Sequence, residues 1–185
     1  MTFMAVMPRD SREWTVADLA LLPDDGLQYE LLDGVLLVSP APVPLHQRAV
    51  TRVWSLLNDS CPPAGLEAFV APLDWQPDLR TSLQPDVLVV RDEDVERTNI
   101  RKPLVLAVEV LSSSTRRKDQ VSKRSKYEDC GVSSYWIVDP DEPSVLVLDL
   151  VDGHYVETGR AAGSAELRVE RPFPLVITPS ALVDR

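Results

Sequence analysis

The sequence predicts a mixed α/β (α+β) domain in which a central mixed β-sheet is flanked by helices and preceded by an N-terminal β-hairpin. Three observations favour this fold class. Residues 86–90 and 104–111 form two apolar runs with almost no polar alternation, as in strands covered on both faces. Apolar residues recur at helical spacing in residues 44–58. Strand-like and helical segments follow one another in a mixed order, which is typical of a sheet packed against helices.

The N-terminal half contains signals for a helix, a hairpin and a second helix. The first helix is expected at residues 16–22, where a threonine N-cap is followed three residues later by an acid. Residues 28–39 hold two apolar runs joined by Asp33-Gly34, a two-residue turn signal that predicts a β-hairpin. The amphipathic helix at residues 44–58 ends before a Pro-Pro pair.

The C-terminal half is dominated by short strands. One further helix is expected at residues 117–130, because Gly131 gives it a typical C-terminal end. The charged residues 91–99 are expected to form a loop or one helical turn. Strands are expected at residues 67–71, 86–90, 104–111, 135–138, 145–150, 154–156 and 167–169.

Length and composition are those of an ordinary globular protein. The 185 residues fit a single domain, expected to span residues 1–185. No apolar run approaches the ~20 residues that cross a bilayer, and the first residues lack the features of a secretory signal. Cys61 and Cys130 form no CxxC pair and are expected to be free thiols in a reducing compartment. We therefore expect a cytoplasmic protein without membrane partners.

The charge balance bears on nucleic-acid binding. A net charge of −10 argues against tight general binding to phosphates, which normally needs a basic surface. One short segment is nevertheless basic, and it either forms a solvated helix face or contacts phosphates. Its cationic residues are Arg116, Arg117, Lys118, Lys123, Arg124 and Lys126.

Three acidic residues stand among apolar strand residues. Glu109 interrupts the run at 104–111, and a buried charge there needs a metal, a cation or hydrogen-bond donors. A structural salt bridge or an exposed edge position is the alternative. Asp86 opens a strand directly after Pro85, where it either joins a site or caps a turn. Glu30, on the first hairpin strand, faces either solvent or a polar cavity.

Carboxylates at the ends of adjacent strands are typical of sites for hard divalent cations. Mg²⁺ prefers carboxylate, carbonyl and water oxygens. A metal in such a site polarises a phosphodiester oxygen and lowers the pKa of water, and a nearby lysine stabilises developing negative charge. The chain has no phosphate-binding glycine loop, GxSxG or HExxH motif. Metal-assisted phosphodiester chemistry is therefore favoured over P-loop, serine-hydrolase or zinc-protease chemistry.

Several motifs resemble those of a known nuclease family. Pro85-Asp86 and Glu109-Val110-Leu111 resemble the signature of the PD-(D/E)xK superfamily. The wider pattern resembles the Uma-two family of restriction-endonuclease-like proteins. That resemblance is carried by residues 29–34, 85–87, 108–112, 114–116, by Asp119, Lys123, Tyr127 and Gly131-Val132, and by residues 135–140.

One position departs from the superfamily signature. Leu111 replaces its lysine, so the resemblance implies that the following helix supplies one, at Lys123. Asp119, Lys123 and Tyr127 are spaced to share one helix face, consistent with Lys123 aimed at the acids. The alternative is an ordinary ion pair between Asp119 and Lys123, worth ~0.3–0.5 kcal/mol.

The resemblance also implies roles for particular residues. The expected catalytic residues are Glu30, Asp86, Glu109 and Lys123. The three acids, with the main-chain carbonyl of Val110, would hold Mg²⁺ or Mn²⁺. Nucleic-acid contacts are expected from Arg116, Arg117, Lys118 and Arg124.

Other residues are weaker candidates. His46 either approaches the site or is a surface histidine at the start of a helix. His154 is interpreted as structural or exposed. Tyr127, Tyr135 and Trp136 are interpreted as core aromatics rather than base-stacking platforms.

The leading hypothesis is a metal-dependent endonuclease that hydrolyses phosphodiester bonds in DNA. A homodimer is expected, because two symmetric sites are the simplest way to cut both strands of a duplex. The alternative is a catalytically silent module that keeps the nuclease fold for binding or assembly, which the acidic net charge favours. Hydrolysis of another phosphate ester would use the same site.

Overall fold

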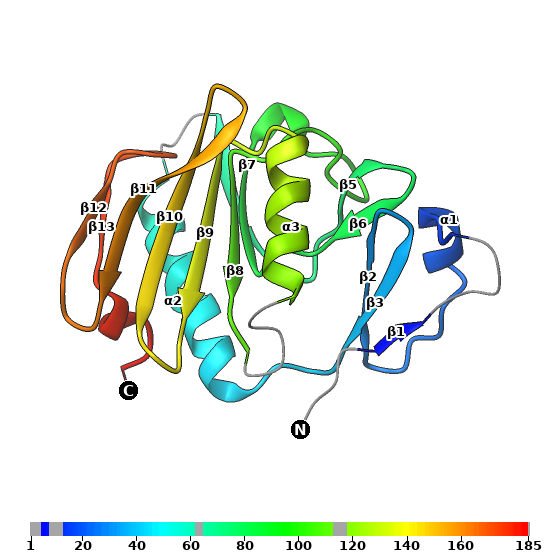
Figure 1. The fold of residues 1–185 in the computed structure, drawn as a ribbon, viewed down its shortest axis with the longest axis horizontal. Coiled ribbons are helices and arrows are strands. Elements are labelled where there is room, and N and C mark those ends of the chain that lie inside the picture. The colour runs from blue at the N-terminus through cyan, green and yellow to red at the C-terminus, as the bar shows by residue number, and fades with distance from the viewer. Residues whose placement is uncertain (1–4, 8–12, 62–64, 113–117, 185) are drawn as a thin grey trace.

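A mixed six-stranded sheet forms the centre of the computed structural model, which describes residues 5–7, 13–61, 65–112 and 118–184 (Figure 1). The strand order is β11-β10-β9-β8-β7-β4. The β8–β9 pair is parallel and the other four pairs are antiparallel, which confirms the predicted mixed sheet. The strands are β4 (Leu66–Val70), β7 (Val87–Arg91), β8 (Leu106–Val110), β9 (Ser134–Asp139), β10 (Ser144–Val151) and β11 (His154–Ala162).

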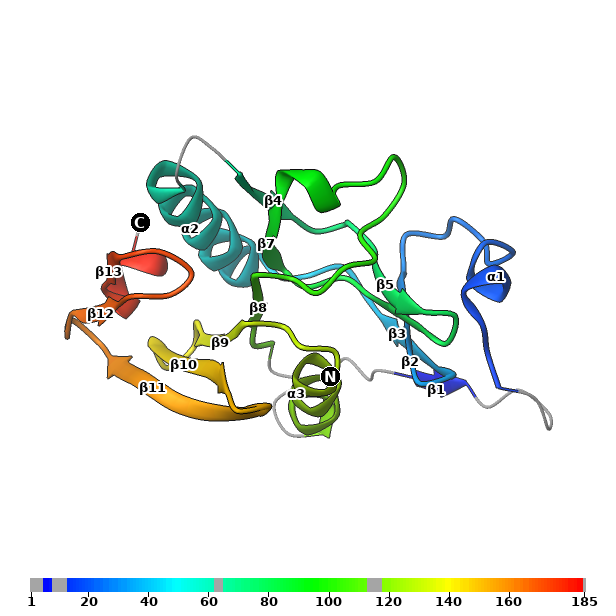
Figure 2. The ribbon, with the colours of Figure 1, turned by 90° about the horizontal axis from the view of Figure 1, so that it is seen from above.

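One helix covers each face of this sheet (Figure 2). Helix α2 (Pro44–Ser60) buries its apolar stripe against one face, in a cluster that includes Val89 of β7. Helix α3 (Lys118–Asp129) lies on the other face, where Tyr127 shares a cluster with Leu88. Adjacent residues of β7 thus pack against opposite helices, which is why this strand is apolar throughout.

A second sheet of five strands packs on the α3 side of the central sheet (Figure 1). The predicted hairpin forms two of its strands, and Asp33 and Gly34 have φ values of 48° and 83° in the turn between them. A two-residue turn of type I′ needs positive φ at both positions. The strands, in the order β1-β3-β2-β6-β5, are β1 (Ala5–Met7), β2 (Gln28–Leu32), β3 (Val35–Ser39), β5 (Trp75–Asp78) and β6 (Thr81–Leu83).

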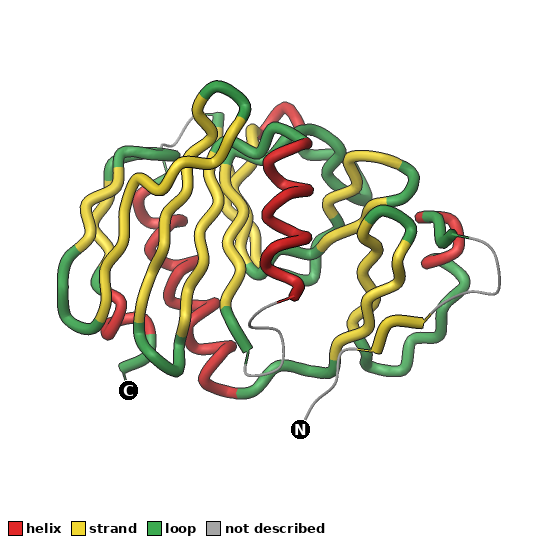
Figure 3. The backbone as a smooth tube through the Cα atoms, viewed as in Figure 1, coloured by secondary structure: helices red, strands yellow, loops and turns green. Residues whose placement is uncertain are grey.

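Strands outnumber helices over most of the chain (Figure 3), and several short elements differ from the sequence prediction. Helix α1 (Val16–Leu19) is shorter than the expected 16–22, because residues 20–22 continue as turns. Strand β11 is longer than expected, and β1, β5, β6 and β13 were not predicted. The elements not yet named are η1 (Asp92–Asp94), β12 (Leu167–Val169), β13 (Leu175–Ile177) and η2 (Pro179–Leu182).

The two sheets and α3 together position the candidate site. The start of β7 and the end of β8 lie side by side, since Val87 pairs with Val108. Helix α3 covers this end of the strands, and β2 of the second sheet faces α3 from the other side (Figure 1). No helix in the described ranges has the length and apolar character needed to span a membrane.

Candidate active site

Asp86 and Val110 are joined where β7 begins and β8 ends. The β7–β8 ladder starts at Val87 and pairs it with Val108, so the main chain of Val110 projects beyond the ladder. Its N–H donates to Oδ2 of Asp86 at 2.7 Å. This bond fixes the Asp86 carboxylate against the end of β8, one residue from Glu109.

His46 approaches the same point from the first turn of α2. Its Nε2 lies 3.0 Å from the carbonyl oxygen of Val110 and 3.4 Å from Oδ2 of Asp86. Because a carbonyl oxygen only accepts, Nε2 carries the proton in this arrangement. Burial lowers the pKa of His46, but Asp86, the Val110 carbonyl and Glu109 together outweigh it, and the net pKa is raised. His46 is 8% exposed, so it approaches the site and is not a surface histidine.

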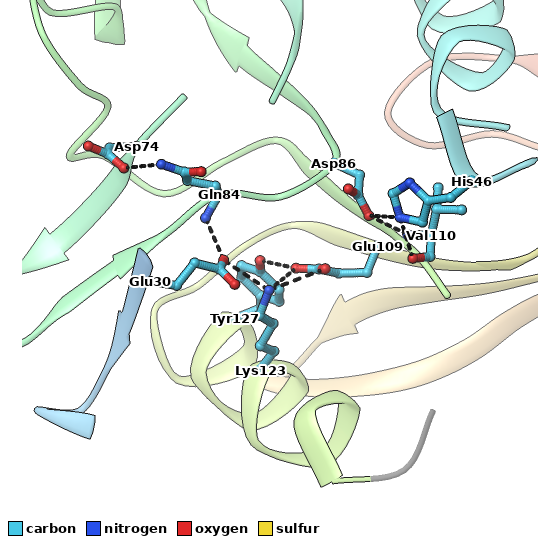
Figure 4. A network of polar contacts seen from close by, with 9 residues as sticks. All are labelled: Glu30, His46, Asp74, Gln84, Asp86, Glu109, Val110, Lys123 and Tyr127. Atoms are coloured by element: carbon cyan, nitrogen blue, oxygen red, sulfur yellow. Dashed lines mark hydrogen bonds and ion pairs between the residues drawn. The ribbon is translucent and has the colours of Figure 1, made fainter. Parts of the chain in front are cut away.

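Lys123 of α3 connects two acids that come from different sheets (Figure 4). Its Nζ donates to Glu30 Oε1 at 2.9 Å and to Glu109 Oε1 at 3.1 Å and Oε2 at 3.3 Å. Burial disfavours the charged ammonium, but the two carboxylates more than compensate and raise the pKa of Lys123. Lys123 is therefore a buried, charged group shared between β2 and β8.

Glu109 has a clearly raised pKa. Burial raises its pKa to about 7 despite Lys123, and the charges of Asp86 and Glu30 add to the increase. The Tyr127 hydroxyl donates to Glu109 Oε1 at 2.7 Å, which partly offsets that increase. Tyr127 is fully buried and is a core aromatic as predicted, but it also contacts the site. Its spacing of four residues from Lys123 could have indicated this.

Glu30 faces the site and not solvent, since it is 9% exposed. Besides Lys123, its Oε1 accepts a hydrogen bond from the main-chain N–H of Gln84 at 2.8 Å. The Gln84 side chain in turn donates to Asp74 Oδ1 at 2.9 Å. Glu30 is thus hydrogen-bonded to the segment that precedes Asp86, and Lys123 links it to Glu109.

Lys126 holds the same helix to two turns of the second sheet. Its Nζ lies 2.7 Å from Asp33 Oδ1 and 2.8 Å from Asp78 Oδ2. Burial opposes the charge of Lys126, but these two carboxylates raise its pKa, and Lys126 lowers the pKa of Asp78. The sequence did not predict this contact, because Asp33 and Asp78 are far from Lys126 along the chain.

The predicted phosphate contacts are only partly described. Arg116 and Arg117 lie outside the described residues, and Lys118 begins α3 without a described side chain. Arg124 is exposed, and its Nη2 donates to the carbonyl of Tyr155 at 3.4 Å. Lys123 points inward to buried carboxylates, and Lys126 pairs with the exposed carboxylates of two turns. Neither lysine is left to form a solvated basic patch.

The remaining candidates are two core aromatics and one exposed histidine, as predicted. Tyr135 and Trp136 are buried in the core, on opposite faces of β9. The side chain of His154 is 83% exposed and lies 3.5 Å from Glu128.

The donor atoms at the junction fit a hard divalent cation. No three His, Cys, Asp or Glu side chains within the described ranges are grouped as a ready-made ion site. The donors here are instead the carboxylates of Asp86 and Glu109 and the carbonyl of Val110, which are oxygen ligands of the kind that Mg²⁺ and Mn²⁺ prefer. Glu30, Asp86 and Glu109 also outnumber Lys123, the one buried lysine or arginine among the described residues. Burial raises the pKa of Glu109 most, and the charges of Asp86 and Glu30 add to the increase.

Comparison with known proteins adds the family context. The model of the family described as "Uma2: Putative restriction endonuclease" matches residues 16–181. A crystal structure described as a putative nuclease belonging to DUF820, from Anabaena variabilis ATCC 29413, has the same fold, with a TM-score of 0.70 and 20% sequence identity. The match covers 92% of this chain and 97% of that one. No curated protein matches the chain.

Proposed function

Because this chain belongs to the Uma2 family of putative restriction endonucleases, we propose that it is a divalent-metal-dependent endonuclease that hydrolyses phosphodiester bonds in DNA. The observation that carries the proposal is the position of Lys123. Its ammonium lies between Glu30 and Glu109, and Glu109 is adjacent to the Asp86–Val110 junction. Three carboxylates and one lysine from four separate chain segments thus meet at one place. A buried cluster of this kind is costly to maintain, which supports a functional role.

The proposed metal ligands are the carboxylates of Asp86 and Glu109 and the carbonyl of Val110. When bound, Mg²⁺ or Mn²⁺ supplies Lewis-acid polarisation of the phosphate and lowers the pKa of water. The hydrogen bond from Val110 N–H holds the Asp86 carboxylate in place before an ion binds. Ligation by Glu30 stays a prediction, since its Oε1 contacts Lys123 and the main chain of Gln84.

Lys123 is proposed to stabilise the negative charge that develops on the phosphate. It keeps its proton, because burial is outweighed by Glu109 and Glu30. A preorganised cation in a buried site is worth far more in the transition state than the same charge in water. Glu30 then acts by holding the ammonium in position, and Tyr127 acts by orienting Glu109.

Phosphate contacts outside the cluster are proposed for Arg116, Arg117, Lys118 and Arg124. With the lysines at 123 and 126 engaged by acids and a net charge of −10, general affinity for DNA should be modest and strongly dependent on salt. A homodimer that presents two such sites to the two strands is part of the proposal. The structural relative is itself described as a putative nuclease, which supports the same function for this fold.

The test is calorimetric titration of Mn²⁺ and Mg²⁺, with a plasmid-nicking assay on the same samples. Wild type should bind metal and nick the plasmid, and Asp86→Ala should do neither. Glu170→Gln, which changes an exposed acid beside β12, is the matched control and should behave as wild type. Undiminished nicking by Asp86→Ala would refute the proposal. Failure of wild type to take up metal would favour the catalytically silent binding module.

A further inference from the structure

The loop between β4 and β5 holds the short segment that joins Glu30 to Asp86. The main-chain N–H of Ala71 donates to the carbonyl of Asp86 at 3.1 Å. Two residues before Asp86, the side-chain amide of Gln84 donates to Asp74 Oδ1 at 2.9 Å (Figure 4). The main-chain N–H of Gln84 donates to Glu30 Oε1 at 2.8 Å. Gln84 therefore contacts the loop with its side chain and the acid with its main chain.

We propose that Asp74 and Gln84 are positioning residues for Lys123, which fix the carboxylate of Glu30 and through it the ammonium group. The inference rests on the proposed function, because it takes Lys123 as the catalytic lysine and Asp86 as a metal ligand. It goes further by naming two residues that belong to neither role and that set where the ammonium lies relative to the ion.

Asp74 determines which way the amide of Gln84 points. A carboxylate only accepts hydrogen bonds, so the amide nitrogen of Gln84 faces it. The amide oxygen of Gln84 is buried and has no hydrogen-bond partner among the described residues. An unpaired buried acceptor costs free energy, and the rotated amide would place two acceptors against each other. The contact with Asp74 is thus what holds this side chain in its orientation.

Asp74 is supported in turn by polar side chains of the second sheet. Its Oδ2 accepts from the side-chain amide of Gln76 at 3.4 Å, and the same nitrogen lies 3.2 Å from Ser82 Oγ. Asn99 donates to Gln76 Oε1 at 2.8 Å. Ser82 is fully buried and Asn99 is nearly so. The carboxylate that orients Gln84 therefore has a fixed position of its own.

The contacts converge on one oxygen atom of Glu30. Oε1 accepts from the main-chain N–H of Gln84 and from Lys123 Nζ, at 2.8 Å and 2.9 Å. A shift of the Gln84 main chain therefore moves the atom that binds the ammonium. Only Pro85 separates Gln84 from Asp86, and its ring restricts the backbone of this segment. The segment thus sets the distance between the ammonium and the proposed metal ligand.

Gln84→Met tests the side-chain contact, because it removes the amide and keeps the main-chain N–H. A misplaced catalytic group lowers turnover steeply, so nicking at saturating Mn²⁺ should fall at least about ten-fold. Mn²⁺ affinity should be unchanged, since the proposed ligands remain. Thr158→Val is the matched control. It removes a 2.8 Å hydrogen bond to the carboxylate of Asp149, outside the cluster, and should nick as wild type.

Exchange of donor and acceptor provides a rescue. Gln84→Glu places a carboxylate against that of Asp74 and should lower the nicking rate at least as much as Gln84→Met. Adding Asp74→Asn restores one hydrogen bond with its direction reversed, because the new amide donates to the new carboxylate. The double variant should recover most of the rate. This comparison holds even if Gln84→Met does not fold.

Nitrogen-15 NMR of the lysine ammonium groups tests positioning in the metal-free protein, without substrate. The lysines of the chain are Lys102, Lys118, Lys123 and Lys126. The buried Lys123 should give a sharp signal, which remains when each of the other three is replaced by Gln. This signal should shift or broaden in Gln84→Met and stay unchanged in Thr158→Val.

The outcomes separate this inference from the proposed function. An altered Lys123 signal in Gln84→Met, together with a rate that the double variant recovers, would support it. A wild-type signal and a wild-type rate in Gln84→Met would overturn the role of both residues and leave the nuclease proposal standing. A reduced rate with an unchanged Lys123 signal would also overturn it, because Gln84 would then act by another route.

Failure of the proposed function has a different signature. If wild type binds metal but does not nick the plasmid, the proposed function fails. The ammonium signal then decides by itself whether Asp74 and Gln84 position Lys123.

Discussion

Lys126 on α3 pairs with Asp33 in the turn of the β2–β3 hairpin, with 2.7 Å between Nζ and Oδ1. Lys123 stands three residues earlier on the same helix, so the pair at the turn holds the helix that carries the proposed catalytic lysine. Helix α3 thus makes ion pairs with the second sheet at two places. Lys126 pairs with the turns of that sheet, and Lys123 pairs with Glu30 in β2.

Replacement of Lys126 should impair the positioning of Lys123 more than it lowers the stability of the fold. Lys126→Gln removes two ion pairs whose acidic partners are 63% and 42% exposed, so the loss in unfolding free energy should be about 1 kcal/mol or less. At saturating metal, the nicking rate should fall by more than this loss of unfolding free energy explains. The affinity for Mn²⁺ should stay unchanged. Lys126→Arg should restore most of the rate. Wild-type rates in Lys126→Gln would show that the contact is not needed to position Lys123.

Replacement of Lys123 should separate metal binding from turnover. Lys123→Met leaves Glu30 and Glu109 buried without their cation, which should destabilise the metal-free protein by about 3–5 kcal/mol. Mn²⁺ should then raise the melting temperature of the variant more than that of wild type, because the ion replaces the missing charge. Nicking should fall at least about 100-fold. An equal metal-induced increase in melting temperature in both proteins would show that the ion and Lys123 do not compensate the same negative charge.

The Tyr127 hydroxyl should matter more than other buried hydroxyls. Tyr127→Phe removes a 2.7 Å hydrogen bond to Glu109 and should cost about 1.5–3 kcal/mol of stability above pH 7, where Glu109 is charged. Tyr135→Phe is the matched control, since the buried Tyr135 hydroxyl has no partner within the described part of the chain. Urea denaturation should show a cost for the first variant and none for the second. Equal effects would mean that the bond to Glu109 has no special weight.

Metal affinity should increase with pH across neutrality. The pKa of Glu109 is raised to about 7, so below pH 7 a proton occupies the carboxylate and must leave before an ion binds. Affinity should therefore fall by up to about ten-fold per pH unit below 7 and level off above it. The raised pKa of His46 acts in the same direction. Calorimetry in buffers of different ionisation enthalpy should detect proton release near pH 6.5, and pH-independent binding without release would contradict the assignment.

Local sequence signals predicted the central part of the fold well. The apolar runs that became β7 and β8 and the Asp33-Gly34 turn of the hairpin were each visible in a few consecutive residues. Short elements were not visible in this way. Strand β5 contains Pro77, which weakens a strand signal, and β1 and β6 are three residues each.

The site was less accessible to local reasoning than the fold. Periodicity left Glu30 with two possible directions, because a hairpin strand alone does not show what covers its second face. Gln84 and Lys123 of α3 contact Glu30 on that face, and they come from segments 54 and 93 residues later. The resemblance to a family grouped the acids with Lys123, and the spacing of Tyr127 from Lys123 indicated its helix face. The contacts of Gln84 and Lys126 depend on tertiary packing that no local pattern contains.

The division of the acids between two sheets gives distant packing residues influence over the chemistry. Lys123 shares one charge between a carboxylate on each sheet, so its distance to Glu109 depends on how closely the sheets dock. Core side chains between the sheets, such as Leu37 and Trp75, therefore influence the distance between Lys123 and Glu109. Laboratory evolution of this protein should therefore accumulate substitutions that alter the cleavage rate in the core between the two sheets, at positions that contact neither metal nor DNA.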